Sequence, residues 1–374
     1  MLLALRRRFG ARGAAALLVG AAFLITRALA IGFTHAGAAT MSPEKRLVWK
    51  YAPGSLRPEA PPRFLEPLQR WDADFYAHLA LRGYPPPDRP RPLYGLGFLP
   101  LYPLIVRAGM QVTGNVYWAA FAVSNLCALL AAMLLVELGA LRRRADGIRA
   151  AVLFLAAPGA NFLSYPYSEP LFAFALAAGL LAARSGALAT AAAAGAAASA
   201  TRPTGLAVAV ALASVPRPRR LVAAALATGG LVAYALWCAR EYGDALAFLH
   251  IQASHKRVLS LFGPVRALFA FDVDPDYYLV TIAGIAVAVL MVRRTPAWAW
   301  LTAWFLLLLP MATGTLQAMV RYQSTNLPLI CGVPVVLRGR WFWRATGSHP
   351  LPAVVDAGSW LTGWLIPPIP CRLG

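Results

Sequence analysis

Ten apolar stretches make up most of this 374-residue sequence and restrict it to a fold of membrane helices. Hydrophobic residues account for 59% of the chain and charged residues for only 13%, whereas a soluble domain carries about 25% charge. The composition therefore predicts an all-α polytopic membrane protein. We expect the spans at residues 13–33, 115–138, 150–164, 169–183, 187–200, 204–215, 220–238, 278–292, 296–314 and 325–338.

Several of these stretches fall short of the ~20 residues that cross a bilayer, and 187–215 could form one long helix instead of two. Arginine clusters distinguish the two topologies, because positive charge gathers on the cytoplasmic side. Ten spans with both termini in the cytoplasm place every cluster there, from Arg6 to Arg344. One helix across 187–215 would place Arg217 to Arg220 outside. We therefore predict ten spans in a cell membrane.

This topology places the polar motifs together on the non-cytoplasmic side. Residues 34–112 form a long Pro-rich first loop there. Within it, "FLEPLQRWDADFYAHLALRGY" has the apolar spacing of an amphipathic helix, and residues 94–110 are apolar but interrupted by Pro; we expect both segments at the membrane interface. Residues 1–344 are predicted to form one domain, followed by a Pro- and Gly-rich tail, 345–374, without a predicted role.

The net charge of +20 does not indicate a nucleic-acid partner. Of the 35 basic residues 32 are Arg, which with the Ala-rich helices suggests a GC-rich coding sequence, and no segment resembles a nucleic-acid-binding module. Basic residues at span ends also contact anionic lipid headgroups. We expect neither a disulfide framework nor a metal site, because the cysteines are scattered and lack ligand spacing: Cys127, Cys238, Cys331 and Cys371.

The charged stretch "RWDADFY" contains the first candidate functional residues. On a helix Asp72 and Asp74 would face about 200° apart, so one can enter a cavity while the other meets water or pairs with Arg70. A single carboxylate at a membrane-embedded site suits a general base that deprotonates an acceptor hydroxyl. The alternative is a solvated cluster in which both acids pair with Arg70 and Arg82.

The motif "NFLSYPYSEP" joins two short spans and contains Glu169, the only acid between residues 150 and 240. Its tyrosine hydroxyls and carboxylate could bind sugar hydroxyls. An aromatic belt around an ordinary Pro turn is the alternative interpretation.

Two arginines stand at the ends of predicted spans. Arg202 in "SATRPTG" precedes a helix-breaking Pro, and its always-charged fork suits a phosphate; snorkelling to the interface is the alternative. Arg321 in "MVRYQ" stands before the last span. In "GDALAFLHIQASHKR", His250 and His255 are five residues apart, which is poor spacing for chelation on a helix, and we interpret that segment as a basic anchor.

Five blocks together resemble a known family. In order, "RWDADFYAHLALRGY" with "FLPLYPLIVR", "NFLSYPYSEPLFAFALAAGLLAAR", "SATRPTG", "GDALAFLHIQ" and "RYQSTNLPL" resemble the PIG-V-like mannosyltransferases, over roughly residues 60–335. The resemblance implies a GT-C-type bundle. It also implies a dolichyl- or polyprenyl-phosphate mannose donor and an inverting, metal-independent transfer on the non-cytoplasmic face, without a cofactor. The acceptor would be a hydroxyl of a glycan, lipid or protein.

The resemblance also implies roles for particular residues. Asp72 matches the catalytic carboxylate, while the family position of Asp74 is variable. Arg202 and Arg321 match positions that would bind the donor phosphate. Sugar or acceptor contacts are implied for Trp71, Tyr76, Tyr167, Glu169 and Tyr322. The chain is shorter than eukaryotic members and looks bacterial in composition, where GPI anchors are absent, so no particular acceptor is implied.

Two other functions use similar chemistry. A transporter or flippase of a lipid-linked sugar would use the same Arg–phosphate contacts, but it would need polar residues along a path through the membrane, and the spans are almost bare of them. A ligase or polymerase of surface polysaccharide shares the lipid-phosphate chemistry and lacks the ordered motifs. The sequence therefore favours the transferase.

Overall fold

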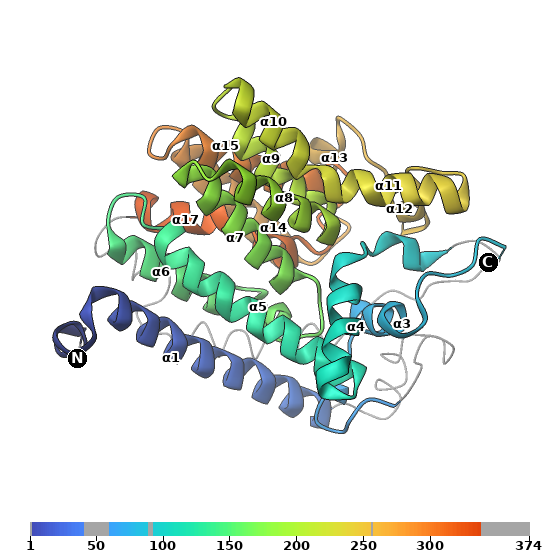
Figure 1. Cartoon of the computed structure of the whole chain (residues 1–374), viewed down its shortest axis with the longest axis horizontal. Helices are drawn as coiled ribbons and strands as arrows, with labels where there is room; N and C mark the ends of the chain where they lie inside the picture. The colour runs from blue at the N-terminus through green and yellow to red at the C-terminus, as the bar shows by residue number, and fades with distance from the viewer. Residues whose placement is uncertain (1, 41–59, 89–92, 256, 338–374) are drawn as a thin grey trace.

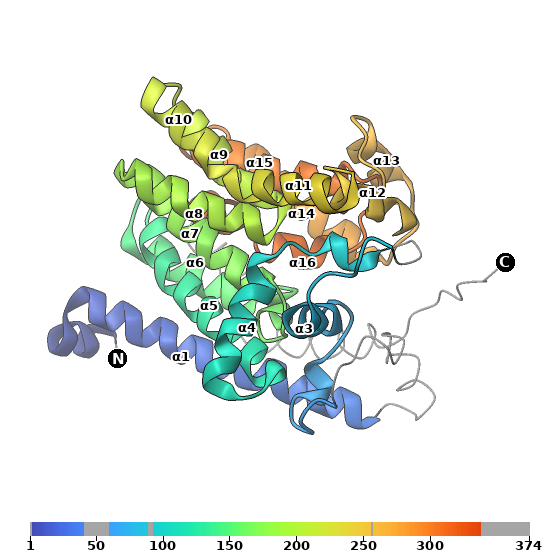
Figure 2. The ribbon, with the colours of Figure 1, turned by 45° about the vertical axis from the view of Figure 1, so that its right-hand side comes forward.

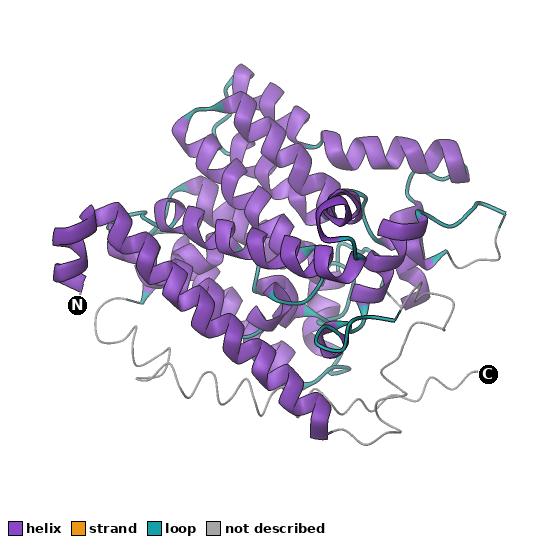
Figure 3. Ribbon diagram, turned by 60° about the horizontal axis from the view of Figure 1, so that its bottom comes forward, coloured by secondary structure: helices purple, strands orange, loops and turns teal. Residues whose placement is uncertain are grey.

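The computed structural model describes residues 2–40, 60–88, 93–255 and 257–337, and within these residues all regular structure is helical (Figures 1 and 3). Many of the helices are short, and Pro or Gly commonly stands at the breaks. The α-helices are α1 Leu2–Thr40, α3 Asp72–Arg82, α4 Leu101–Thr113, α5 Val116–Leu138, α6 Arg144–Ala156, α7 Glu169–Ser185, α8 Leu188–Thr201, α9 Ala207–Ala213, α10 Pro218–Ala227, α11 Gly229–Tyr242, α12 Ala247–His250, α13 Gly263–Phe269, α14 Pro275–Met291, α15 Ala297–Met311, α16 Met319–Gln323 and α17 Leu327–Val336. The 3-10 helices are η1 Glu66–Leu68, η2 Tyr94–Gly97, η3 Ala160–Leu163, η4 Pro203–Leu206 and η5 Ile251–His255.

The helices have the length and apolarity of a membrane protein. Gly10–Thr40 and Val116–Leu138 are each long and apolar enough to cross a bilayer, and the pair α10 and α11, bent by 44°, makes a third if it forms one span. Shorter apolar helices cover most of the other predicted spans, among them α8, α14, α15 and α17. The chain is therefore a helical membrane protein, and the count of ten crossings stays a prediction.

Small side chains allow the central helices to pack closely. In two views α5, α7 and α8 lie side by side, and α1 runs along the edge formed by α5 and α6 (Figures 1 and 2). The buried cluster among these helices is dominated by Ala. Close approach of small residues is how membrane helices gain packing contacts without a hydrophobic driving force.

One predicted span is not a continuous helix. Residues 150–164 do not form a single helix, because α6 ends at Ala156 and η3 begins only at Ala160. Pro158 disfavours a helical Ala157, which is extended with ψ 158°. Gly159 then takes a left-handed φ of 82° and starts the turn toward the "SYPYSE" segment.

The predicted amphipathic helix around Asp72 is also interrupted. A 3-10 turn at Glu66–Leu68 is followed by a break, and α3 begins only at Asp72. The break is centred on Trp71, whose φ is 46°. Its consequence is that Asp72 starts a helix instead of lying within one.

The alternative of one long helix across 187–215 is wrong as well. α8 ends at Thr201, Arg202 is extended (φ −153°, ψ 146°), and η4 and α9 follow in a new direction. Gly205 lies so close to α8 that a Cβ atom there would be 2.2 Å from the carbonyl carbon of Ala198. The reversal therefore requires Gly at 205, and it places Arg202 at the turn.

The first predicted loop, 34–112, begins later than expected, because α1 continues to Thr40. It holds η1, α3, η2 and α4, and α3 and α4 pack together beside the start of α5 (Figure 2). Residues 41–59 and 89–92 of this loop, and the tail 345–374, lie outside the described residues. The placement of its helices at the membrane interface stays a prediction.

Candidate active site

A pocket of about 660 Å³ opens where segments distant in sequence meet. Its walls come from the start of α3, Gly97–Leu99, the turn after α8, residues 248–253, His255, residues 257–259, the end of α15, and α16. Trp71, Asp72, Tyr76, Tyr167, Arg202, Arg321 and Tyr322 all line it. The structure thus brings together seven of the eight residues singled out in the sequence.

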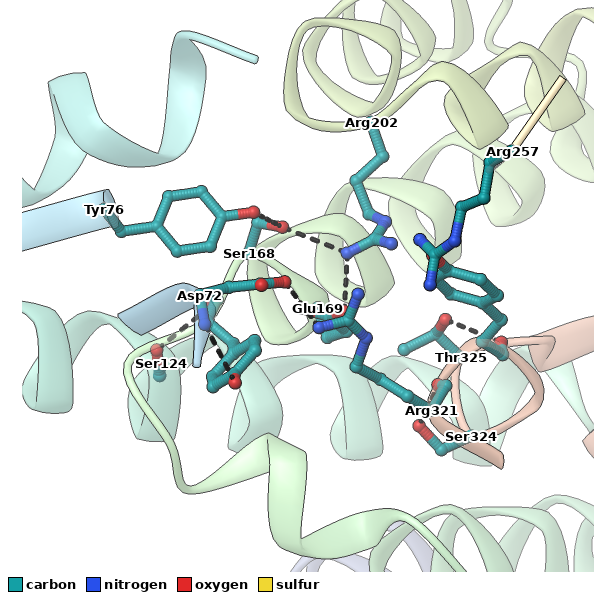
Figure 4. Close-up of polar contacts among 12 residues, drawn as sticks. Asp72, Tyr76, Ser124, Ser168, Glu169, Arg202, Arg257, Arg321, Ser324 and Thr325 are labelled. Atoms are coloured by element: carbon teal, nitrogen blue, oxygen red, sulfur yellow. Dashed lines mark hydrogen bonds and ion pairs between the residues drawn. The ribbon is translucent and has the colours of Figure 1, made fainter. Parts of the chain in front are cut away.

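The eighth residue, Glu169, lies behind the pocket wall. Its side chain is fully buried, and its Oε1 accepts from Arg202 Nη1 at 2.6 Å and lies 3.1 Å from Arg321 Nε (Figure 4). Within the described residues its Oε2 has no hydrogen-bond partner. Glu169 therefore orients Arg202 and Arg321 from behind the pocket wall and does not line the pocket itself.

Asp72 forms an ion pair with Arg321, from Oδ2 to Nη1 at 2.5 Å (Figure 4). The two residues are 249 positions apart in the chain. Asp72 is 28% exposed and faces the pocket, whereas Asp74 is buried and is absent from the lining. This arrangement agrees with the opposed directions predicted for the two acids.

Both carboxylates stand at the first position of a helix, Asp72 in α3 and Glu169 in α7. A helix N-terminus favours negative charge because its N–H groups point outward unpaired. A chain of polar contacts continues from there: Arg202 Nη1 donates to Ser168 Oγ at 3.2 Å, and the hydroxyls of Ser168 and Tyr76 are 2.6 Å apart.

Arg257 belongs to the site, although the sequence pattern assigned it to basic anchoring. It lines the pocket, donates from Nη2 to Gln317 Oε1 at 3.1 Å, and from Nη1 to the Tyr322 hydroxyl at 3.4 Å. Local sequence offered no sign of this, because Tyr322 is 65 positions away. Phe162 also lines the pocket, and the sequence pattern assigned it no role.

The site has an excess of positive charge. Three guanidinium groups, from Arg202, Arg257 and Arg321, face two carboxylates, from Asp72 and Glu169, which leaves one net positive charge among these five side chains. The hydrogen bonds found for Arg257 within the described residues go to neutral oxygen atoms. Arg257 is thus the arginine of the three that lacks a carboxylate partner there.

The Tyr322 phenol is surrounded by these arginines. It lies in α16, between the apolar helices α15 and α17, and the guanidinium carbons of Arg202 and Arg321 are each 5.3 Å from its ring centroid. Burial acts to raise the pKa of Tyr322, but the nearby guanidinium charges outweigh it and lower the pKa to about 8. The pocket therefore stabilises negative charge at this position.

In residues 2–40, 60–88, 93–255 and 257–337 no group of three or more His, Cys, Asp or Glu side chains gathers in a way that could hold a metal ion. The His250 ring instead lies 2.7 Å from Asp244, measured from Nδ1 to Oδ2.

The fold and the pocket define a helical membrane protein with a mixed-charge site that favours anions. A comparison with protein-family models then gives the family: residues 23–216, more than half of the chain, match the mannosyltransferase (PIG-V) family. The chain belongs to this family and is a membrane mannosyltransferase, which confirms the resemblance. Comparisons with curated proteins and with solved structures returned no match.

The family match covers only part of the pocket. Asp72, Glu169 and Arg202 lie within residues 23–216, whereas Arg257 and Arg321 lie beyond them. The structure therefore adds two arginines, Arg257 and Arg321, to Arg202, the pocket arginine that the family match covers. Membership of a mannosyltransferase family also favours the transferase over the transporter considered above.

Proposed function

We propose that this mannosyltransferase moves mannose from a polyprenyl-phosphate donor to a hydroxyl of a glycan, lipid or protein acceptor. The transfer inverts the anomeric carbon, needs no metal, and takes place on the non-cytoplasmic face of a cell membrane, with both termini cytoplasmic. The observation that carries the proposal is the Asp72–Arg321 pair at the edge of a pocket with net positive charge. A bacterial source stays a prediction from composition.

The donor phosphate is expected among Arg202, Arg257 and Arg321. Guanidinium forks bind phosphate oxygens through charge-assisted hydrogen bonds. Arg257 is the strongest candidate for direct contact, because its hydrogen bonds go to the neutral Gln317 and Tyr322 and its charge is not balanced by an acid there. Arg202 and Arg321 keep N–H groups beyond those used by the carboxylates, since each fork has five.

An apolar wall next to Arg257 suits the lipid tail of the donor. Val258 and Leu259 line the pocket directly after Arg257, together with Leu309 and Pro310 of α15. Leu259 is still 46% exposed. A hydrogen bond of 2.8 Å from Ser260 N to the Ala312 carbonyl joins the segment after Arg257 to the end of α15. A polyprenyl phosphate has a charged headgroup joined to an apolar chain, and this wall places apolar side chains directly beside an arginine.

Asp72 would act as the general base. Its Oδ2 is held by Arg321, and within the described residues no hydrogen bond to Oδ1 is found, so Oδ1 can accept a proton. The acceptor oxygen attacks C1 of mannose and gives its proton to Asp72. The bond from C1 to the phosphate oxygen breaks, and its electron pair stays on polyprenyl phosphate, whose developing charge the arginines stabilise. Attack from the face opposite to the phosphate inverts C1.

A direct assay tests the proposed function. Purified protein is incubated with radiolabelled polyprenyl-phosphate mannose and a membrane extract, and the labelled product is identified by mass spectrometry. Label transfer from this donor in the presence of a chelator, but not from a nucleotide-linked mannose, supports the proposal. Transfer only from the nucleotide donor would overturn it.

The contribution of the apolar wall to donor binding can be tested with donors of different chain length. Replacing Leu259 with Asn is expected to raise the KM of a long-chain donor roughly tenfold, the equivalent of ~1.4 kcal/mol of lost apolar contact. A short-chain donor that does not reach Leu259 should be unaffected. Leu226→Asn, at a 61% exposed position on α10 outside the pocket, is the matched control. Equal changes for both donors would argue against this path for the tail.

The lowered pKa of Tyr322 predicts a pH dependence of donor binding. Below a pH of about 8 the phenol is neutral, and above it the phenolate opposes the negative phosphate. Donor affinity should therefore fall as the pH rises through about 8, and Tyr322→Phe should remove this decrease. Calorimetric titration with a short-chain polyprenyl phosphate measures both. An unchanged pH profile in the variant would show that another group is responsible.

A further inference from the structure

The residue before Asp72 has a strained backbone. Trp71 takes φ 46° and ψ −113°, far from the ψ of about +30° to +60° that L-residues adopt at positive φ. Such a conformation persists only when surrounding contacts hold it, and strain of this kind gathers at functional sites. The Trp71 ring itself packs beside Phe162, with centroids 6.1 Å apart.

One hydroxyl bridges the two sides of this strained residue. The Tyr167 hydroxyl donates to the Arg70 carbonyl at 2.9 Å and accepts from the Asp72 backbone N–H at 3.3 Å. The first N–H groups of a helix have no partner inside the helix, so Tyr167 also satisfies one of them at the start of α3. Arg70 and Asp72 are thereby fixed relative to each other with Trp71 between them.

Tyr167 is itself held in place by burial and by hydrogen bonding of its backbone. Its side chain is fully buried. Its carbonyl accepts from Ser124 Oγ at 3.2 Å, and Ser124 in turn lies 2.7 Å from the Tyr102 hydroxyl. The clamp that Tyr167 forms between Arg70 and Asp72 is therefore supported by Tyr102 in α4 and by Ser124 in α5.

The hydrogen-bonding capacity of the hydroxyl is largely used within the protein. A phenol has one hydrogen to donate, and Tyr167 gives it to Arg70. The family resemblance implied sugar or acceptor contacts for Tyr167. The geometry instead points to a role through the backbone of Asp72.

We propose that Tyr167 is a positioning residue, which holds the strained Trp71 turn so that Asp72 starts α3 with Oδ2 on Arg321 and Oδ1 toward the acceptor. The inference rests on the proposed role of Asp72 as the base. Release of the turn lets Trp71 relax to an ordinary backbone conformation, and this rotates the first residue of α3. The donor arginines keep their places, since Glu169 holds two of them independently.

The test is a double-mutant cycle in the full-length protein. Tyr167→Phe removes only the hydroxyl and is expected to lower kcat roughly 10- to 100-fold, as misplacement of a reacting group by about 1 Å does. Donor KM should change less than about threefold, because the phosphate contacts remain. In a Trp71→Gly background the same substitution should cost less than about threefold, since Gly adopts this backbone without strain.

Matched controls separate the outcomes. Tyr165→Phe removes a neighbouring buried hydroxyl, 3.1 Å from Thr34, and should leave kcat near the wild-type value. If Trp71→Gly does not fold, the ratio of the kcat loss to the donor KM change in Tyr167→Phe alone decides, because a general loss of structure would change both together. An equal kcat loss from Tyr167→Phe in both backgrounds, or a rise in acceptor KM alone, would overturn the clamp. Lack of transfer by the wild-type protein would instead overturn the proposed function.

Discussion

Replacing Asp72 with Asn is expected to abolish mannose transfer, with a loss of about 10²- to 10⁴-fold in kcat, the usual contribution of a general base. Asn has the same shape and still accepts a hydrogen bond from Arg321, but it cannot take the acceptor proton. Donor affinity should be kept or strengthened, because the substitution removes one negative charge from a pocket that already has an excess of positive charge. The measurement combines single-turnover kinetics with calorimetric titration of a polyprenyl phosphate.

Asp74→Asn is the matched control for this prediction. The residue is the same type, lies two positions away, and is absent from the pocket lining. Turnover per folded molecule should therefore stay near that of the wild type. Wild-type turnover in Asp72→Asn would remove Asp72 as the base, and loss of turnover in Asp74→Asn with Asp72 intact would mean that the wrong acid had been chosen.

Sequence patterns predicted the helical membrane class well, because the apolar stretches make up most of the chain and are nearly free of charge. They predicted the interruptions less well. Pro158 and Gly159 stand in the middle of a stretch that we expected to be continuous, and local signals there were sufficient to place the break. The break at Trp71 is different, since the apolar spacing continues across it, and the hydroxyl that bridges the break comes from Tyr167, 95 positions away.

The residues that meet in the pocket could be predicted better than their pairing. The predicted topology put Asp72, Arg202 and Arg321 on one side of the membrane, and the structure brings the three residues into one pocket. Which acid pairs with which arginine depends on contacts between segments far apart, and no local pattern records them. Arg257 was missed for the same reason, because its neighbours in sequence resemble an ordinary basic anchor.

Removal of the Arg321 guanidinium is expected to have the second largest effect, on stability and on donor binding together. Arg321 is 13% exposed and pairs with both Asp72 and Glu169. These two carboxylates raise the pKa of Arg321 above its ordinary value against the opposing effect of burial. Arg321→Gln leaves Asp72 without its arginine and leaves Glu169 paired with Arg202, and breaking a buried pair in this way costs ~3 kcal/mol or more. Thermal unfolding in detergent measures the loss.

The double variant Asp72→Asn/Arg321→Gln separates the two effects. It removes both charges of one ion pair and leaves the pair between Arg202 and Glu169 intact, so roughly half of the lost stability should return. Donor affinity should stay about 10- to 100-fold below that of the wild type, because a charge-assisted hydrogen bond to phosphate is still missing. Arg184→Gln is the control: this arginine donates to the Leu138 carbonyl at 3.0 Å, outside the pocket. It should lose stability without losing donor affinity. Recovery of donor binding together with stability in the double variant would mean that Arg321 serves the fold alone, and that Arg202 and Arg257 suffice to hold the phosphate.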